Sequence, residues 1–327
     1  MFIKRLSLAI ASAAISLTLG CANALTTVSA EPNNAATRNF DQIYVFGDSL
    51  SDVGNVYKAT QGQSPSSPPY YKGRYSNGPV WVEYLASNLK LTSTPETNFA
   101  FGGATTGESR SLPIGLLAQI KTFTATHQSA DPQALYIVWA GANDYLGGVT
   151  DTKTPINNLA TAVKSLSAAG AKNIVVVNLP DLGQLPSTRN SRVAQTLNAV
   201  TRKHNTELAR LLNNLHQQLN SDTKLIYLDA NSLFNQAIKT PKKFGFKNVT
   251  QACFSQGRIC NNPKEYLFWD GIHPTTIAHQ LLVQSTFSDL KPAPQPSAST
   301  PNTKIPLGMM ILGILGTGLI IKSTKVI

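Results

Sequence analysis

Short apolar runs alternate with amphipathic helical patterns along the middle of this 327-residue chain, and no other feature constrains its fold as strongly. The helical patterns cover residues 80–90, 116–127, 155–169, 191–219 and 275–288. Continuous apolar runs are typical of strands that are buried on both faces. Five such strands are predicted, at residues 43–46, 97–101, 134–140, 173–179 and 224–229.

Alternating strands and helices predict a parallel sheet with helices on both faces. We therefore expect an α/β protein with a three-layer αβα, flavodoxin-like fold and about five parallel strands in the order 2-1-3-4-5. In this order, ligands bind where the carboxyl ends of the first and third strands meet. Residues 31–290 would form this one domain.

The first predicted strand leads directly into a candidate nucleophile. Gly47 allows a sharp turn at its end, and Asp48 and Ser49 follow. A serine at this place can face a substrate while its backbone N–H remains able to donate. Ser49 could equally be a helix N-cap, so this stretch alone does not decide its role.

A second stretch, DGIHP at residues 270–274, could supply the proton acceptor. Asp270 lies three residues before His273, so that its carboxylate can hold the imidazole Nδ1–H. The Nε2 atom of His273 would then be able to take a proton from Ser49. An exposed turn before a helix would have the same sequence, and alone the pattern is weak.

Ester chemistry also needs donors for an oxyanion, and three candidates follow predicted strands. Ser49 offers its backbone N–H, Asn143 its side-chain amide, and the pair Gly102-Gly103 a backbone N–H. Each has a plain structural alternative as a turn residue. Their joint presence in the expected order favours a catalytic site.

Taken together, these stretches resemble the SGNH/GDSL hydrolase family over about residues 41–290. The motifs that carry the resemblance are FGDSLSDVGN (46–55), GRYSNGPV (73–80), NFAFGGA (98–104), GAND (141–144) and DGIHP (270–274). The resemblance implies a triad of Ser49, Asp270 and His273, and an oxyanion hole of Ser49, Gly103 and Asn143. The long first motif is similar to the branch of secreted lipases, phospholipases and related esterases.

The two chain ends have the composition of targeting segments. Lys4 and Arg5 precede an apolar run, and Ala22-Asn23-Ala24 follows it, so residues 1–30 are predicted to be a signal peptide. A lipoprotein signal at Cys21 is the less favoured alternative. A Pro/Ser/Thr-rich linker is expected at residues 291–304, and residues 305–327 are expected to be a membrane anchor or sorting tail.

These ends also account for more than half of the net charge of +11. They hold six bases and no acid, which leaves 22 bases against 17 acids between them. No basic run is interleaved with aromatic residues, so nucleic-acid binding has no support.

Cys253 and Cys260 remain if the signal peptide is removed. In an exported chain we expect these two to form a disulfide, with a metal pair as the alternative. No suitably spaced histidine stands beside them. The other histidines, His127, His216 and His279, are predicted to lie on solvated faces and His204 at the edge of the core.

The sequence thus predicts an exported, membrane-tethered serine ester hydrolase that acts as a monomer, without metal or cofactor. It would be located in the periplasm, at the cell surface or outside the cell. The expected substrate is a lipid or an acylated small molecule or glycan. Two alternatives remain open: a carbohydrate O-deacetylase on the same fold, and a surface-anchored binding protein on an inactive one.

Overall fold

The computed structural model describes residues 40–219 and 221–287, and these contain a parallel four-stranded sheet. Its strands are β1 (Ile43–Gly47), β2 (Leu135–Trp139), β3 (Asn173–Val177) and β4 (Lys224–Leu228), paired in this order. Each pair is parallel and in continuous register, from Ile43 opposite Leu135 to Val177 opposite Leu228. The predicted α/β class and the order of these four strands are confirmed.

The fifth predicted strand, residues 97–101, is reduced to one parallel bridge between Asn98 and Val45. Its backbone still bonds to β1, for example from Phe99 N–H to the Val45 carbonyl oxygen at 2.7 Å. The Asn98 and Ala100 carbonyl oxygens instead accept hydrogen bonds from the side chain of Asn55. The prediction of a full strand was wrong, because the Gly47 N–H, which would extend the pairing with this segment, donates to Gln119 Oε1 at 2.9 Å instead.

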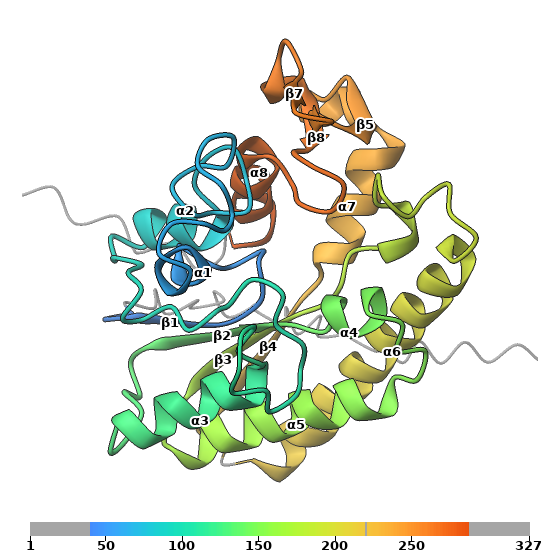
Figure 1. Cartoon of the computed structure of the whole chain (residues 1–327). Helices are drawn as coiled ribbons and strands as arrows, with labels where there is room; N and C mark the ends of the chain where they lie inside the picture. The colour runs from blue at the N-terminus through green and yellow to red at the C-terminus, as the bar shows by residue number, and fades with distance from the viewer. Residues whose placement is uncertain (1–39, 220, 288–327) are drawn as a thin grey trace, which may run out of the picture. The chain divides into compact units, whose positions relative to one another are not determined.

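Helices cover both faces of the sheet, as Figure 1 shows. On one face lie α3 (Leu116–Thr126), α5 (Lys153–Ala168) and most of α6 (Ala194–Gln218). On the other lie α2 (Trp81–Asn88), α7 (Ala230–Lys239) and α8 (Thr276–Thr286). Alternate residues of each strand point to the two faces, so that Ile137 belongs to one core cluster and Tyr136 and Val138 to the other.

Two five-residue helices follow the first two strands. They are α1 (Asn55–Ala59) and α4 (Ala142–Leu146). The segment between α7 and α8 holds a two-stranded sheet of β5 (Asn248–Ala252) and β8 (Tyr266–Phe268), and a hairpin of β6 (Phe254–Ser255) and β7 (Arg258–Ile259). Three 3₁₀ turns complete the described elements, at Leu182–Gln184, Pro241–Phe244 and Pro263–Glu265.

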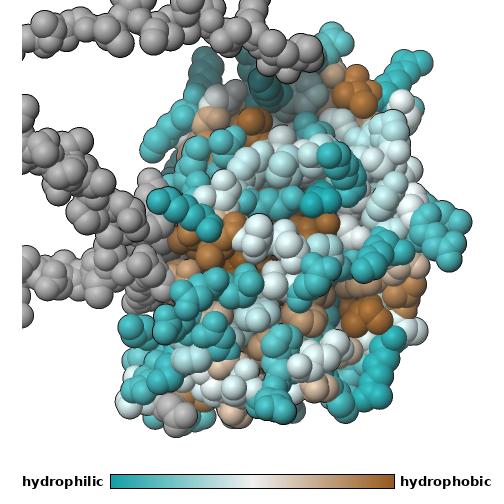
Figure 2. Space-filling model, turned by 90° about the vertical axis from the view of Figure 1, so that its left-hand side faces the viewer, coloured by the Kyte–Doolittle hydropathy of each residue, from teal (hydrophilic) through white to brown (hydrophobic). Residues whose placement is uncertain are grey.

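The described surface is largely hydrophilic on the face shown in Figure 2, where hydrophobic residues form separate patches. Within residues 40–219 and 221–287, no helix has both the length and the apolarity needed to cross a membrane. The predicted signal peptide (1–30), linker (291–304) and anchor (305–327) lie outside the described residues.

Candidate active site

Ser49 lies at the carboxyl end of β1, in a turn that its neighbour Asp48 stabilises. Asp48 Oδ1 accepts the Leu50 N–H at 3.0 Å, and the Asp48 carbonyl oxygen accepts the Ser51 N–H at 3.0 Å. Position 47, at the end of β1, requires glycine, because a side chain there would collide with the carbonyl oxygen of Trp139 on β2. The predicted place of Ser49, at the end of the first strand, agrees with the structure.

The DGIHP turn brings His273 and Asp270 to this serine. His273 Nε2 lies 2.9 Å from Ser49 Oγ, and His273 Nδ1 lies 2.7 Å from Asp270 Oδ2. The other carboxylate oxygen, Asp270 Oδ1, accepts the backbone N–H groups of Ile272 and His273. The three side chains therefore form one continuous hydrogen-bonded relay, although Ser49 and His273 are 224 residues apart.

The electrostatics keep Asp270 ionised. Burial alone would raise the pKa of its carboxyl, but the positive charge of His273 and hydrogen bonds from His273 and Tyr70 outweigh burial and lower the pKa to about 2. Asp48 behaves in the opposite way, because burial raises its pKa to about 6 despite the Leu50 bond and the His273 charge. Two carboxyl groups near one histidine thus differ in charge at mildly acidic pH.

The candidate oxyanion donors differ in the hydrogen bonds that they already make. The Gly102 N–H donates to Asp52 Oδ2 at 2.9 Å, which leaves Gly103 as the glycine able to offer its N–H. Gly103 has a φ of +82°, a backbone conformation that favours glycine. The Asn143 amide donates one N–H to the Ala104 carbonyl oxygen at 2.9 Å, which orients the amide and leaves its second N–H.

A narrow, mostly apolar pocket opens beside Ser49, with Asn143 in its wall. Its lining comes from the turn after β1, from α4, from the segment after β3, from α7 and β8, and from the turn that carries His273. The apolar members are Leu50, Ala142, Leu146, Pro180, Leu182, Leu185, Phe234, Phe268, Ile272 and Pro274. This pocket can hold an apolar group whose polar end reaches Ser49.

Asp52 and Asp144 brace loops at the site, as expected from the motifs. Asp52 accepts the backbone N–H groups of Gly54, Asn55, Val56 and Gly102. Asp144 accepts both the backbone N–H and the hydroxyl of Thr106. The loop that carries Gly103 is therefore bonded to the loops after β1 and β2.

Tyr70 also reaches the relay, and the sequence analysis did not include it. Its hydroxyl donates to Asp270 Oδ2 at 2.6 Å. The two residues are 200 positions apart and share no local pattern, so no signal in the sequence could have identified this contact.

The other histidines lie outside this relay. His204 is fully buried and its Nδ1 lies 2.8 Å from the Tyr145 hydroxyl. His279 is buried in α8, so its predicted solvated position was wrong; the apolar face of α8 includes it. His216 is exposed and His127 half-buried. Among the residues that the structure describes, no three His, Cys, Asp or Glu side chains are grouped as a metal site.

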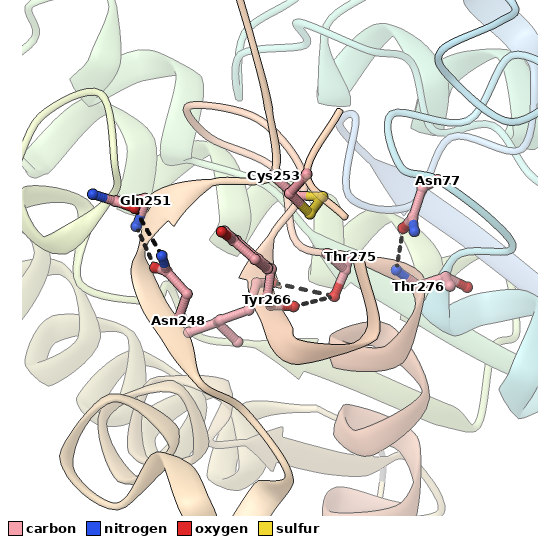
Figure 3. Close-up of a disulfide and its surroundings, with 9 residues drawn as sticks. Asn77, Asn248, Gln251, Cys253, Tyr266, Thr275 and Thr276 are labelled. Carbon is pink, nitrogen blue, oxygen red and sulfur yellow. Dashed lines mark hydrogen bonds between the residues drawn. A yellow bond between two sulfur atoms is a disulfide. The ribbon is translucent and has the colours of Figure 1, made fainter. Parts of the chain in front are cut away.

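The structure joins Cys253 to Cys260 by a disulfide that closes the β6–β7 hairpin. Figure 3 shows this disulfide beside β8 and the start of α8, where the Thr275 hydroxyl donates to the Tyr266 carbonyl oxygen at 2.8 Å. In the same view, Asn77 Oδ1 accepts the Thr276 N–H at 2.9 Å. The segment before α8 is thus fixed from both sides.

This chain is similar to several known proteins. The model of the family described as GDSL-like Lipase/Acylhydrolase matches residues 43–285. The phosphatidylcholine-sterol acyltransferase of Aeromonas hydrophila is 32% identical, with 74% of this chain and 88% of that protein aligned. The thermolabile hemolysin of Vibrio parahaemolyticus is 27% identical, over 77% of this chain and 65% of that protein.

A solved structure from the lipolytic G-D-S-L family of Veillonella parvula is 16% identical and has a TM-score of 0.46. The alignment covers 74% of this chain and 94% of that one.

Proposed function

Since the chain belongs to the GDSL-like lipase/acylhydrolase family and is therefore an ester-bond hydrolase, we propose that it works through an acyl-enzyme on Ser49. The observation that carries this proposal is the relay from Ser49 Oγ through His273 to Asp270, with heavy-atom distances of 2.9 and 2.7 Å. Such a relay is the arrangement that serine nucleophiles need.

In this mechanism Ser49 Oγ attacks the ester carbonyl while His273 Nε2 takes its proton. His273 then gives the proton to the leaving alcohol, and Asp270 stabilises the imidazolium that forms between these steps. The backbone N–H groups of Ser49 and Gly103 and the amide of Asn143 donate to the oxyanion. Water repeats the same sequence on the acyl-enzyme and releases the acid.

We assign the acyl chain to the apolar pocket beside Ser49. Its lining is mostly hydrocarbon, and Asn143 and Ser49 lie in its wall, where an ester carbonyl would have to be. The Aeromonas hydrophila relative is by name a phosphatidylcholine-sterol acyltransferase, which favours a lipid ester as substrate and allows an alcohol to replace water.

The nucleophile is tested by the change Ser49→Ala. Hydrolysis of p-nitrophenyl butyrate should fall by about 10³–10⁶-fold with an unchanged circular dichroism spectrum, because triad members act as one unit. The change Ser66→Ala, at an exposed serine, is the matched control and should keep full activity. Near-normal turnover by a folded Ser49→Ala protein would favour the inactive, ligand-binding alternative.

The substrate class is tested with the wild-type protein. An acyl-length series of p-nitrophenyl esters, phosphatidylcholine vesicles with and without sterol, and acetylated xylan should be compared under one set of conditions. Lipid esters are expected to have the highest kcat/KM. Preference for the acetylated glycan would instead support the O-deacetylase alternative.

We also propose export, with the signal peptide in residues 1–30 and a membrane tether in residues 305–327. The support is the sequence alone: a basic start with a 14-residue apolar run after it, and a late apolar run followed by Lys322 and Lys325. Full-length protein should sediment with membranes, whereas a chain that ends at residue 290 should be soluble and active. Intact full-length protein found only in the soluble fraction would contradict the tether.

A further inference from the structure

The Asp270 carboxylate is held by a residue outside the five family motifs. Tyr70 donates its hydroxyl to Asp270 Oδ2 at 2.6 Å, and the same oxygen lies 2.7 Å from His273 Nδ1. Asp270 Oδ1 accepts two backbone N–H groups of its own turn. One carboxylate oxygen is thus shared between the imidazole and the tyrosine hydroxyl.

We propose that Tyr70 is a positioning residue of this site, which orients the Asp270 carboxylate and withdraws part of its negative charge from His273. The inference rests on the proposed triad. A carboxylate that accepts a second strong hydrogen bond at the oxygen facing the imidazole stabilises the imidazolium less. Tyr70 therefore sets how readily His273 binds and releases the proton of Ser49.

Tyr70 can act only as a donor at this position. Its ring is half-buried, and burial together with the bond to Asp270 raises the pKa of its hydroxyl well above the usual range. The hydroxyl stays protonated wherever the enzyme is folded near neutral pH. Tyr70 is absent from the lining of the pocket beside Ser49, so it acts through Asp270 and not on the acyl group.

The ring of Tyr70 is held by aromatic neighbours on two sides. It packs edge-on against Phe254 at 6.0 Å between ring centroids and against Tyr75 at 6.2 Å. Phe254 is stacked on Trp269, at 5.7 Å, and follows Cys253 of the disulfide. The Tyr70 ring therefore packs against a residue of the disulfide-closed β6–β7 hairpin.

The segment around Tyr70 is also bonded to the segment around Asp270. Ser76 donates its hydroxyl to the Pro274 carbonyl oxygen at 2.9 Å, and Asn77 Oδ1 accepts the Thr276 N–H at 2.9 Å (Figure 3). With the Tyr70 bond, three side chains of residues 70–77 form hydrogen bonds to residues 270–276. The distance between the Tyr70 hydroxyl and Asp270 is therefore set by more than one contact.

Other titratable groups near His273 would stay in place when Tyr70 is changed. The buried Asp48 comes from the turn after β1 and His279 from α8, and the charge of His273 acts on both. Tyr75 packs its ring on the His273 ring at 5.1 Å. Any shift in the pH profile after a change at Tyr70 can then be attributed to the lost hydroxyl.

The test is Tyr70→Phe against the matched control Tyr71→Phe. Tyr71 is the next residue, half-buried, with its ring beside Lys72 and Arg74 and with no side-chain hydrogen bond to the described residues. Hydrolysis of p-nitrophenyl butyrate is measured as a function of pH, at the isosbestic wavelength of the product, together with the thermal midpoint.

For Tyr70→Phe we expect kcat to fall about tenfold, because the lost hydrogen bond no longer orients the Asp270 carboxylate toward His273, and this outweighs the stronger hold on the imidazolium. KM should change little. The acid limb of the kcat/KM profile should move to higher pH, since the carboxylate then holds the imidazolium more strongly. Tyr71→Phe should match the wild type in kcat and in pH profile.

Two results overturn the inference: an unchanged kcat and profile in Tyr70→Phe, or a lower kcat and thermal midpoint with an unmoved acid limb, which would mark a structural role only. If Tyr70→Phe does not fold, the change Phe254→Leu is measured instead. It keeps the Tyr70 hydroxyl and weakens the packing against the Tyr70 ring. It should move the acid limb in the same direction by less, and an unmoved limb contradicts the inference. The Ser49→Ala result separates this failure from failure of the triad itself.

Discussion

At the scale of single residues, hydrogen-bond partners decide roles that the sequence leaves ambiguous. Gly102 and Gly103 are equivalent in the sequence, but Asp52 occupies the N–H of Gly102. Asn143 has one amide N–H bonded to Ala104 and a second one to offer. A donor that is already held in place loses little freedom when charge develops on the substrate oxygen.

The change Asn143→Ala should therefore lower kcat by about 10²–10³-fold, or about 2.7–4 kcal/mol in transition-state stabilisation. KM should change little, because the charge on the oxygen exists only in the transition state. Steady-state kinetics with p-nitrophenyl butyrate measure both constants. A rise in KM alone would mean that Asn143 is a substrate contact and not an oxyanion donor.

Asp48 gives a prediction about stability at the same scale. Its pKa is about 6 when folded and 3.8 in the reference state, so the folded protein retains a proton in this window that the unfolded chain has lost. The contribution of protonated Asp48 to the free energy of unfolding is therefore fully present below about pH 4. It is lost as the pH rises through about 6. Asp48→Asn keeps an oxygen for the Leu50 N–H and cannot ionise.

The free energy of unfolding of Asp48→Asn, minus that of the wild type, should therefore increase between pH 4 and pH 7. The shift of about two pKa units corresponds to at most about 3 kcal/mol. Urea unfolding at the two pH values measures this difference. A difference that does not depend on pH would show that folding does not raise the pKa of Asp48.

At the scale of elements, the apolar patterns predicted the positions of the sheet strands and the long helices, whereas the short helices were missed. The 25-residue helix α6 and the four strands of the sheet lie where the patterns placed them. The helices α1 and α4 have five residues each, too few for a helical period to be seen. The segment at residues 97–101 was mistaken for a full strand because Gln119, which takes the Gly47 N–H and ends the pairing, is distant in the sequence.

At the site, too, residues in local motifs could be predicted from the sequence, whereas a contact between distant residues could not. The proximity of Ser49, Asp270 and His273 could be predicted because each residue lies in a local motif, and Asp270 and His273 lie in one turn. Tyr70 could not be found, because its only mark is a contact across 200 residues. His279 was misplaced because a single histidine on a short amphipathic helix can lie at the border of the apolar face.

The β6–β7 hairpin carries a prediction at this scale. Its disulfide closes a loop with a sequence separation of seven residues, for which loop-closure entropy gives about 2–3 kcal/mol. The double change Cys253→Ala with Cys260→Ala should lower the free energy of unfolding by this amount, measured by urea denaturation without reductant. Wild type in excess dithiothreitol is the control and should show the same loss. Equal stability in all three samples would mean that the pair is not bonded.

At the scale of the whole molecule, folding buries two histidines in neutral form. Burial lowers the pKa of His204 to about 4 and that of His279 to about 3, against 6.5 in the reference state. Between these values the unfolded chain binds protons that the folded chain does not. Each histidine therefore makes the fold less stable as pH falls from 6.5, with a slope of about 1.4 kcal/mol per pH unit.

The change His279→Phe should remove the pH dependence of the unfolding free energy that this histidine causes, while filling a similar volume. Relative to wild type, the variant should gain about 1.4 kcal/mol per pH unit in unfolding free energy as pH falls from 6 to 4. Urea denaturation across this range provides the measurement. His216→Phe, at an exposed position on α6, is the control and should leave the pH dependence unchanged. If the unfolding free energies of His279→Phe and wild type depend on pH in the same way, His279 is not neutral in the folded protein.

The separation of 224 residues between Ser49 and His273 also orders events during biosynthesis. Ser49 directly follows β1, the first strand of the described residues, and His273 comes just before α8, the last described helix. On the proposed mechanism, a nascent or truncated chain carries the nucleophile for most of its synthesis without a base to activate it. On the same proposal, the nucleophile and its base come together only once nearly the whole domain has been made.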